Sequence, residues 1–239
     1  MNLFYKKAIE KSLKLESLET TIIIIPNRRS KTFIKEIILS KIKKVSISPE
    51  IYSIDDFIER IADSQESDKT SILFYLYESF METSKNKDFE SYHTFRKWAN
   101  ILLDDINDIQ MSGANHIEVF DYLIEIKKIS LINDNDKSTL EFWKMIPKII
   151  NLFISKLKTN KIYNKGLVHL EAQKNIEYYS NAHKAYNFII LGLNSLSNVE
   201  ANILEYLLSN NKSKIYWDCD KSFTNNSISQ MGYFFRKYK

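Results

Sequence analysis

The chain has 239 residues, a net charge of +4 and 44% hydrophobic residues, which is enough for one large or two small packed domains. Its four glycines and three prolines disfavour β-sandwiches, glycine-rich loops and disordered linkers. The one cysteine, Cys219, excludes a disulfide framework and a multi-cysteine metal site within the chain.

The charge is divided unevenly along the chain. Residues 1–50 carry +6, residues 51–125 carry −10 and residues 126–239 carry +8. An acidic middle between basic ends indicates an inserted segment, and the basic ends suit either a nucleic-acid surface or an ordinary solvated one. The first twenty residues have no apolar signal-peptide core, and no apolar run has the roughly 18–20 residues that a membrane span requires. We therefore expect a cytoplasmic protein that does not enter a membrane.

The first predicted element is a buried strand at residues 20–25, a short and continuous β-branched run. A turn with the sequence PNRRSK follows at residues 26–31, and residues 31–42 then have helical apolar spacing. This is where a nucleotide-binding α/β domain carries its phosphate loop, which requires glycines and a Lys-Ser/Thr pair. The turn has no glycine and contains two arginines, so it keeps the strand–turn–helix order without the chemistry that holds ATP.

The next segment, residues 45–52, reads as an edge strand or a loop, because Pro49 cannot donate a hydrogen bond to a sheet. Ser53 is predicted to cap the following helix, with Asp56 three positions later. From residue 54 to about residue 180 the apolar spacing is almost purely helical.

Two further strands are predicted after the helical block, at residues 188–191 and 214–217. Between them, Ser197 and Glu200 have the spacing of a capping box at the start of a helix. Strand–helix–strand at this spacing is a βαβ unit, which implies a parallel pair with a right-handed crossover.

Together these elements predict an α/β fold in two parts. Residues 1–53 and 185–239 form a parallel-sheet core, and residues 54–184 form a large all-helical insertion. We interpret the core as a degenerate version of the P-loop NTPase fold, because the turn at residues 26–31 keeps the position of a phosphate loop and lacks its glycines.

Four residues of the first turn are candidates for binding DNA phosphate: Arg28, Arg29, Ser30 and Lys31. The N-terminus of a helix binds anions through its free N–H groups and its macrodipole. The alternative is that the arginines pair with nearby acids or stay solvated.

Asp218 and Asp220 follow the last predicted strand and form a degenerate Walker-B-like region. Without a phosphate loop there is no magnesium nucleotide for them to serve, so we expect them to anchor the loop. The four histidines are scattered without metal-ligand spacing. The sequence therefore predicts no catalytic residue, no metal site and no cofactor in this chain.

Five segments have a recognisable order and spacing: IIIIPNRRS at residues 22–30, PEIYSIDDFI at 49–58, LGLNSLSNVE at 191–200, IYWDCD at 215–220 and GYFFR at 232–236. In this order they resemble AddB-like proteins of the PD-(D/E)XK nuclease family, of the Bacteroidetes type. Members of that family begin with an inactivated superfamily 1 helicase-like region and end with a RecB-type nuclease domain. This chain is similar to the helicase-like part alone.

The resemblance implies a role in DNA repair and recombination. It implies binding of single-stranded DNA or duplex ends, and scaffolding of an active AddA-like helicase–nuclease, without ATP hydrolysis. The paired acids and lysine of the nuclease motif are absent from the 239 residues, so no enzymatic activity is expected of this chain.

Two other functions stay open. One is an interaction scaffold that contacts a partner helicase and binds no DNA. The other is a nucleotide-binding enzyme with an unorthodox phosphate site, which nucleotide binding measured by calorimetry would support.

Overall fold

The computed structural model describes residues 3–13, 15–42, 45–84, 91–130, 137–220, 224 and 233–237. The chain divides into two compact units. Unit 1 comprises Met1–Ile61 and Ala172–Lys239, and unit 2 comprises Ala62–Glu171.

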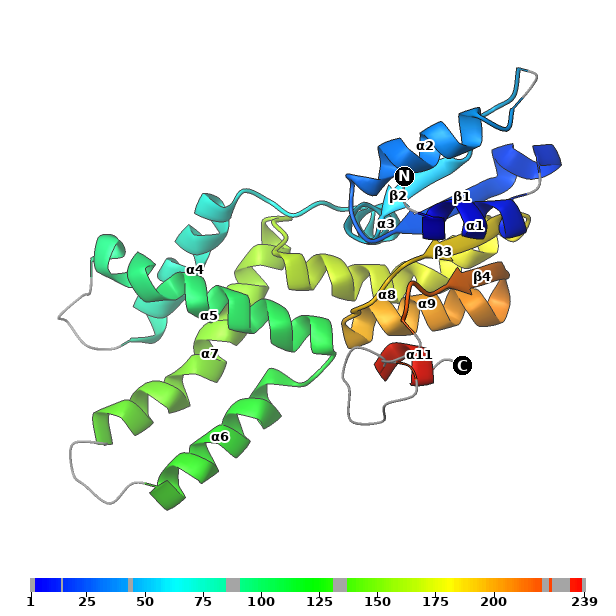
Figure 1. Ribbon diagram of the computed structural model, residues 1–239. Helices are drawn as coiled ribbons and strands as arrows, with labels where there is room; N and C mark the ends of the chain where they lie inside the picture. Colours follow the sequence, from blue (N-terminus) through cyan, green and yellow to red (C-terminus); the bar gives the residue numbers. More distant parts are fainter. Residues whose placement is uncertain are drawn as a thin grey trace. The chain divides into compact units, whose positions relative to one another are not determined.

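Within the described residues, unit 1 is built on a four-stranded parallel sheet (Figure 1). The strands are β1 (Thr21–Ile25), β2 (Glu50–Ser53), β3 (Asn187–Leu191) and β4 (Lys212–Tyr216). Their order in the sheet is β2-β1-β3-β4. This confirms the predicted parallel α/β core and the parallel βαβ pair at its end.

The strand sequences explain their places in the sheet. Every residue of the central strand β1 is buried, as expected for a β-branched run covered on both faces. Within it, Ile23 pairs with Ile51 of β2 on one side and with Ile189 of β3 on the other. Strand β2 begins directly after Pro49 and lies at an edge, where the missing N–H costs no ladder hydrogen bond.

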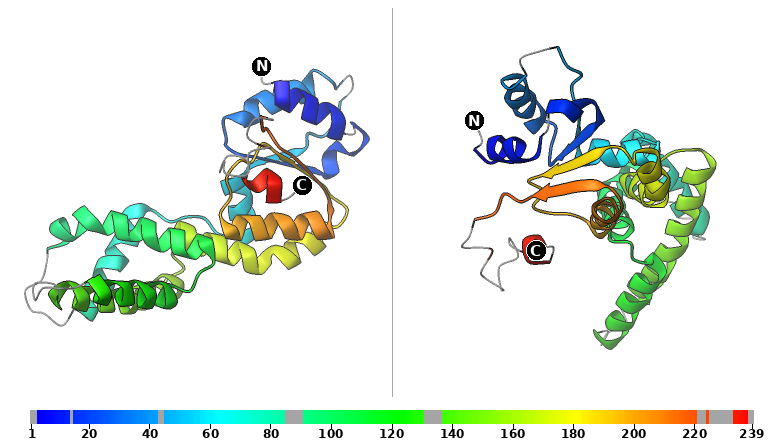
Figure 2. Two further views of the ribbon diagram at one scale, coloured as in Figure 1. Left: turned by 60° about the horizontal axis from the view of Figure 1, so that its bottom comes forward. Right: turned by 90° about the vertical axis from the view of Figure 1, so that its right-hand side faces the viewer.

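Helices cover both faces of this sheet (Figure 2). The helical elements of unit 1 are α1 (Leu3–Ser12), the 3₁₀ segment η1 (Leu15–Thr20), α2 (Ser30–Leu39), α3 (Ile54–Ala62), the end of α8 (Lys165–Ala182), α9 (Asn198–Asn210) and α11 (Tyr233–Lys237). Helices α1 and α2 bury Ile9, Ile34 and Ile38 against one face. Gly232, the first residue of the GYFFR segment, lies outside the described residues.

The opposite face is covered by α3, the end of α8 and α9 (Figure 2). Phe57 of α3 packs edge-on against Phe188 of β3 and Tyr179 of α8, with ring centroids 6.3 and 5.7 Å apart. This packing assigns α3 and the end of α8 to unit 1. The compact helical unit is therefore shorter at both ends than the insertion of residues 54–184 that the apolar spacing predicts.

In the described residues of unit 2, helices are the only regular secondary structure. It contains α4 (Lys69–Thr83), α5 (Tyr92–Ser112), α6 (His116–Ser130), α7 (Lys137–Thr159) and the start of α8. Its core includes Leu76, Phe95, Ile106 and Phe153, all fully or almost fully buried. None of the described helices of the chain is both long enough and apolar enough to span a membrane.

A candidate nucleic-acid interface at the carboxyl edge of the sheet

The connections of unit 1 run in opposite directions from the centre of the sheet. The chain passes from β1 to β2 on one side, and from β3 to β4 on the other. Right-handed crossovers in opposite directions place α2 and α9 on opposite faces, as observed (Figure 1). The loops that leave the carboxyl ends of β1 and β3 therefore diverge, and such a topological switch point is where α/β proteins bind their ligands.

The turn after β1 is closed by its own side chains. The Asn27 Oδ1 atom accepts a hydrogen bond from the backbone N–H of Ser30 at 3.1 Å and lies 3.3 Å from the Ser30 hydroxyl, which donates to it. Asn27 therefore caps the first turn of α2, and Arg29, at the N-cap position, contributes no side-chain cap. A phosphate loop would present this N–H to a ligand; here the protein uses it internally.

Helix α1 fills the space between the two diverging loops. The hydroxyl of Tyr5 lies 3.2 Å from the hydroxyl of Ser30, and both residues are buried. On the other side, a Cβ placed on Gly192 would lie 3.7 Å from the Tyr5 hydroxyl and 3.2 Å from the ring of Phe4. The hydroxyl of Tyr5 thus lies between the turn after β1 and the loop after β3.

The loop after β3 is shaped by Gly192. Its φ of 67° is in the left-handed region that glycine adopts without strain, and its N–H donates to the carbonyl of Tyr216 at 2.8 Å. The helix that follows has the predicted capping box. The Glu200 N–H donates to Ser197 Oγ at 3.2 Å, and the Ser197 N–H donates to Glu200 Oε2 at 2.7 Å.

Arg28 is bound to an acid of the neighbouring connection. Its Nη2 atom lies 2.6 Å from Asp56 Oδ1, and its Nε atom donates to the same oxygen at 2.8 Å. Asp56 stands in the first turn of α3, where its N–H donates to Ser53 Oγ at 3.2 Å, as the sequence predicts. The pair joins the turn after β1 to the start of the helix after β2, and it corresponds to the ion-pair alternative for this arginine.

The ion pair shifts the pKa values of both partners. Partial burial raises the pKa of Asp56, but the hydrogen bonds from Arg28 and Ser53 and the charge of Arg28 outweigh it, so the pKa lies below its usual value. The hydrogen bond to Asp56 and the charge of that carboxylate raise the pKa of Arg28. Both groups are charged over the whole neutral range.

The remaining candidates differ in accessibility. Arg29 is exposed and Lys31 half-buried, and neither forms an ion pair with any residue that the structure describes. Ser30 is only 8% exposed, and its hydroxyl is engaged with Tyr5 and Asn27. Of the four residues predicted to contact phosphate, Arg29 and Lys31 are therefore the two cations that remain available.

The two acids after β4 lie at the far side of the sheet. Asp218 and Asp220 are both exposed, and β3 separates their strand from β1. The backbone carbonyl of Asp220 accepts from the N–H of Thr224 at 3.2 Å. The structure therefore brings the four turn residues together and leaves this Walker-B-like region one strand away from them.

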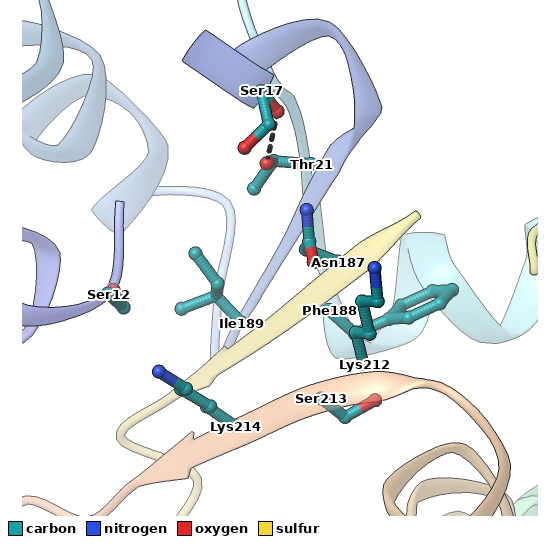
Figure 3. A pocket seen from close by; sticks show the side chains of 9 residues that line it. All are labelled: Ser12, Ser17, Thr21, Asn187, Phe188, Ile189, Lys212, Ser213 and Lys214. Atoms are coloured by element: carbon teal, nitrogen blue, oxygen red, sulfur yellow. Dashed lines mark hydrogen bonds between the residues drawn. The ribbon is translucent and has the colours of Figure 1, made fainter. Parts of the chain in front are cut away.

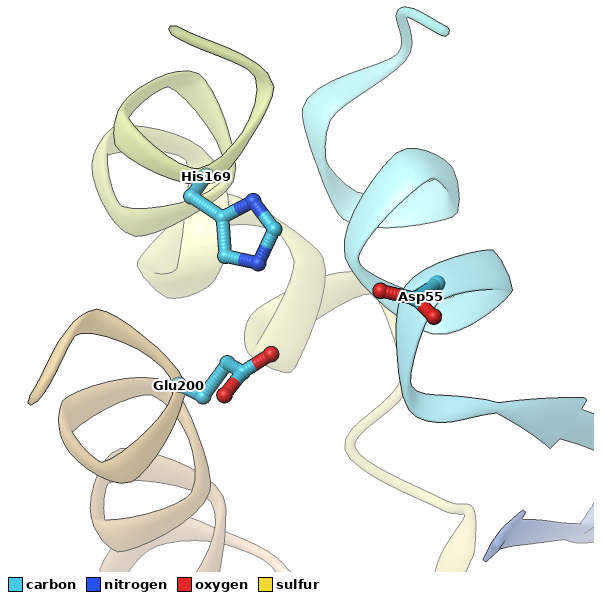
Figure 4. A group of neighbouring side chains, drawn as sticks. All are labelled: Asp55, His169 and Glu200. Atoms are coloured by element: carbon cyan, nitrogen blue, oxygen red, sulfur yellow. The ribbon is translucent and has the colours of Figure 1, made fainter. Parts of the chain in front are cut away.

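Two carboxylates of unit 1 approach each other in a way that the sequence does not predict. The side-chain oxygens of Asp55, in the first turn of α3, and Glu200, in the first turn of α9, lie within 4.8 Å of each other (Figure 4). Acids in the first turn stabilise a helix through its macrodipole, which accounts for both positions. Their proximity depends on strand order, so no local pattern could have indicated it.

A tyrosine cluster beside β2 was also missed. Tyr52 donates a short hydrogen bond to Glu50, and burial together with this carboxylate raises the pKa of Tyr52 to about 12. Burial also raises the pKa of Tyr179, whose ring stacks on His183 at 4.1 Å. Both phenols keep their protons at neutral pH, so neither serves as a nucleophile there.

Comparison with known proteins does not identify the chain: no protein-family model matches it, and no curated protein matches it.

Proposed function

We propose that this chain is a non-catalytic, helicase-like DNA-binding and scaffold region of an AddB-type helicase–nuclease that acts in double-strand-break repair and recombination. The single observation that supports this best is the turn after β1. It stands at the switch point of a parallel sheet, is closed by Asn27 and Tyr5, and carries two cations, Arg29 and Lys31, without ion-pair partners among the described residues.

We expect no ATP hydrolysis because of the chemistry of this turn. Nucleotide binding requires backbone N–H groups that converge on the phosphates, and glycines that let the backbone approach them. In this turn the Ser30 N–H is bound by Asn27, and the Ser30 hydroxyl, which would contact magnesium in a phosphate loop, is bound by Tyr5 and Asn27. We propose that the turn after β1 no longer binds ATP but still lies next to bound DNA.

DNA binding is proposed to use the phosphate backbone. Arg29 and Lys31 stand at the first turn of α2, where the helix macrodipole adds to their positive charge. Contacts of this kind position a strand without reading its sequence. The proposed ligands are single-stranded DNA or duplex ends in the cytoplasm, and the proposed partner is an active AddA-like helicase–nuclease.

Fluorescence anisotropy with a labelled single-stranded oligonucleotide tests this function. We expect the Arg29→Ala/Lys31→Ala variant to bind at least about tenfold more weakly than the parent, because two charge-assisted contacts are lost. The matched control is Lys144→Ala/Lys148→Ala, which removes the same charge from two exposed positions of α7 and should bind DNA as the parent does. Failure of the parent chain to bind DNA at low salt contradicts the proposal.

An ATPase assay provides a second, independent test. No hydrolysis above background is expected with or without DNA. Turnover that is abolished by Asp218→Ala would contradict the non-catalytic assignment, because it would mean that the acid after β4 serves a bound nucleotide.

A second candidate function is a protein-interaction scaffold for the partner helicase that binds no DNA itself. The observation that favours it is a group of exposed apolar side chains on α2 and the segment after it. Phe33 is 50% exposed, Leu39 68% and Ile47 65%. In this case Phe33→Ser/Leu39→Ser should weaken a complex with a purified AddA-like helicase in size-exclusion chromatography, while the parent shows no DNA binding.

A further inference from the structure

Unit 1 has a cavity of about 580 Å³ at the amino ends of its strands (Figure 3). The cavity is at the opposite edge of the sheet from the turn after β1. Its walls come from the end of α1, from η1 and from the first residues of β1, β3 and β4. A volume of this size lies within the range of about 300–1,000 Å³ that is usual for small-molecule sites.

Strand register places three polar side chains on one face of this cavity. Asn187 is aligned with Lys212, and Ile189 is aligned with Lys214. Because aligned residues of parallel strands point to the same face and alternate residues share a face, Asn187, Lys212 and Lys214 lie on the side that carries Ile189. Figure 3 shows the side chains of Lys212 and Lys214 extending from β4 next to Asn187 and Ile189 of β3.

Three of the four hydroxyl groups that line the cavity donate to backbone carbonyls. Thr21 donates to the carbonyl of Ser17 at 2.6 Å, Ser12 donates to the carbonyl of Ala8 at 2.7 Å, and Ser213 donates to the carbonyl of Leu207 at 2.8 Å. They therefore offer acceptor oxygens and no protons to a ligand.

The free donors are the two amines and one amide. Lys212, Lys214 and the side-chain amide of Asn187 have no ion-pair or hydrogen-bond partner among the described residues. None of the described residues that line the cavity is acidic. The described lining of the cavity therefore carries two positive charges and no negative one, which favours an anion as its ligand.

We propose that this cavity binds a diphosphate group, either inorganic pyrophosphate or the diphosphate of a nucleotide. Residues two apart on a strand are separated by about 6.6 Å. Lys212 and Lys214 can therefore each contact one phosphate of a diphosphate, which suits an anion with two phosphates better than an anion with one. The Asn187 amide donates beside them, and Ile189 forms an apolar floor. This site is separate from the carboxyl edge and does not depend on the DNA-binding proposal.

Isothermal titration calorimetry of the whole chain with pyrophosphate, ADP and inorganic phosphate tests the proposal. Pyrophosphate should bind more tightly than inorganic phosphate, and comparison with ADP separates the two sources of the diphosphate group. Lys212→Ala/Lys214→Ala should weaken pyrophosphate binding at least tenfold. The matched control Lys6→Ala/Lys7→Ala removes two exposed lysines of α1 that do not line the cavity, and should change binding less than twofold.

A second variant provides a check by charge alone. Asn187→Asp places a carboxylate beside Lys212 and should also weaken pyrophosphate binding at least tenfold. The proposal is overturned if the parent does not bind pyrophosphate, or if Lys212→Ala/Lys214→Ala and the control lose binding equally. It is also overturned if Lys212→Ala/Lys214→Ala self-associates and still binds pyrophosphate. In that case the two lysines would only prevent strand β4, at the edge of the sheet, from pairing with another chain. The proposal is likewise overturned if Arg29→Ala/Lys31→Ala loses pyrophosphate binding and Lys212→Ala/Lys214→Ala does not, because the anion would then bind at the carboxyl edge of the sheet.

Discussion

The hydroxyl of Tyr5 lies 3.2 Å from the hydroxyl of Ser30, and this contact closes the switch point of the sheet with a side chain from helix α1. An α/β protein that binds a nucleotide keeps this crevice open. Here the Tyr5 hydroxyl lies between the two loops that diverge at the switch point, so a side chain from α1 occupies part of this crevice.

The first prediction concerns Tyr5 itself. Tyr5→Phe should lower the free energy of unfolding by about 1 kcal/mol, because one buried hydrogen bond is lost while the packing is kept. Tyr5→Ala should lower it by about 3–5 kcal/mol, because a cavity is left between α1 and the sheet. Urea denaturation measures both. Equal effects of the two substitutions would mean that the ring does not fill the crevice.

The second prediction uses two glycines with nearly the same backbone conformation. Gly192 and Gly113 have φ values of 67° and 73°, but a Cβ on Gly192 would lie 3.2 Å from the Phe4 ring, whereas a Cβ on Gly113 would have no atom within 4 Å. Each change to alanine should cost about 1–2 kcal/mol from the left-handed conformation. Gly192→Ala should cost more, by the displacement of Phe4. Thermal unfolding compares the two, and a larger loss for Gly113→Ala would contradict the packing of α1 against this loop.

The third prediction concerns the Arg28–Asp56 ion pair. The folded-state pKa of Asp56 is depressed, so the pair stabilises the protein above the ordinary pKa of an aspartate, and this contribution is lost as the pH falls through the folded-state pKa. Arg28→Gln should therefore lower the Tm slightly at pH 7, and should make no difference to the Tm at the acid end of the titration. Thermal unfolding of parent and variant between pH 7 and pH 2 measures this. A Tm difference that is independent of pH would indicate that Arg28 acts through packing.

The fourth prediction addresses a polar cluster in unit 2. Asn164 Nδ2 donates to Asn107 Oδ1 and to Gln110 Oε1, both at 2.7 Å, and the Gly166 N–H donates to Asn107 Oδ1 at 2.9 Å. A Cβ on Gly166 would lie 2.2 Å from Gln110 Oε1 and 2.6 Å from its Cβ. Gly166→Ala should destabilise the chain by about 1–3 kcal/mol through overpacking. Adding Gln110→Ala should restore part of this loss, and no restoration in urea denaturation would contradict the assigned clash.

The sequence was sufficient where a pattern is local. The capping box of Ser197 and Glu200 follows from spacing, and the structure confirms it. Pro49 leaves an edge strand or a loop open for residues 45–52, and the structure has a strand at the edge of the sheet only from Glu50 to Ser53. The parallel pair of β3 and β4 follows from the strand–helix–strand spacing between them.

The contacts that define the switch point could not be read in this way. Tyr5 and Ser30 are 25 residues apart, and Arg28 and Asp56 are 28 apart. These contacts depend on strand order and on which face α1 covers, and the sequence predicts no element at residues 3–12. A tyrosine in a charged N-terminal segment gives no local sign that it will fill a crevice of the sheet.

The salt dependence of single-stranded DNA binding tests the central claim most directly. For each phosphate contact the logarithm of the affinity falls with the logarithm of the salt concentration by a slope of about 0.7. Arg29→Ala/Lys31→Ala should therefore reduce the slope by about 1.4. The control Lys144→Ala/Lys148→Ala should leave it unchanged. An affinity and a slope that are the same in the parent and in Arg29→Ala/Lys31→Ala would contradict the assignment of the turn after β1 as a DNA-phosphate contact.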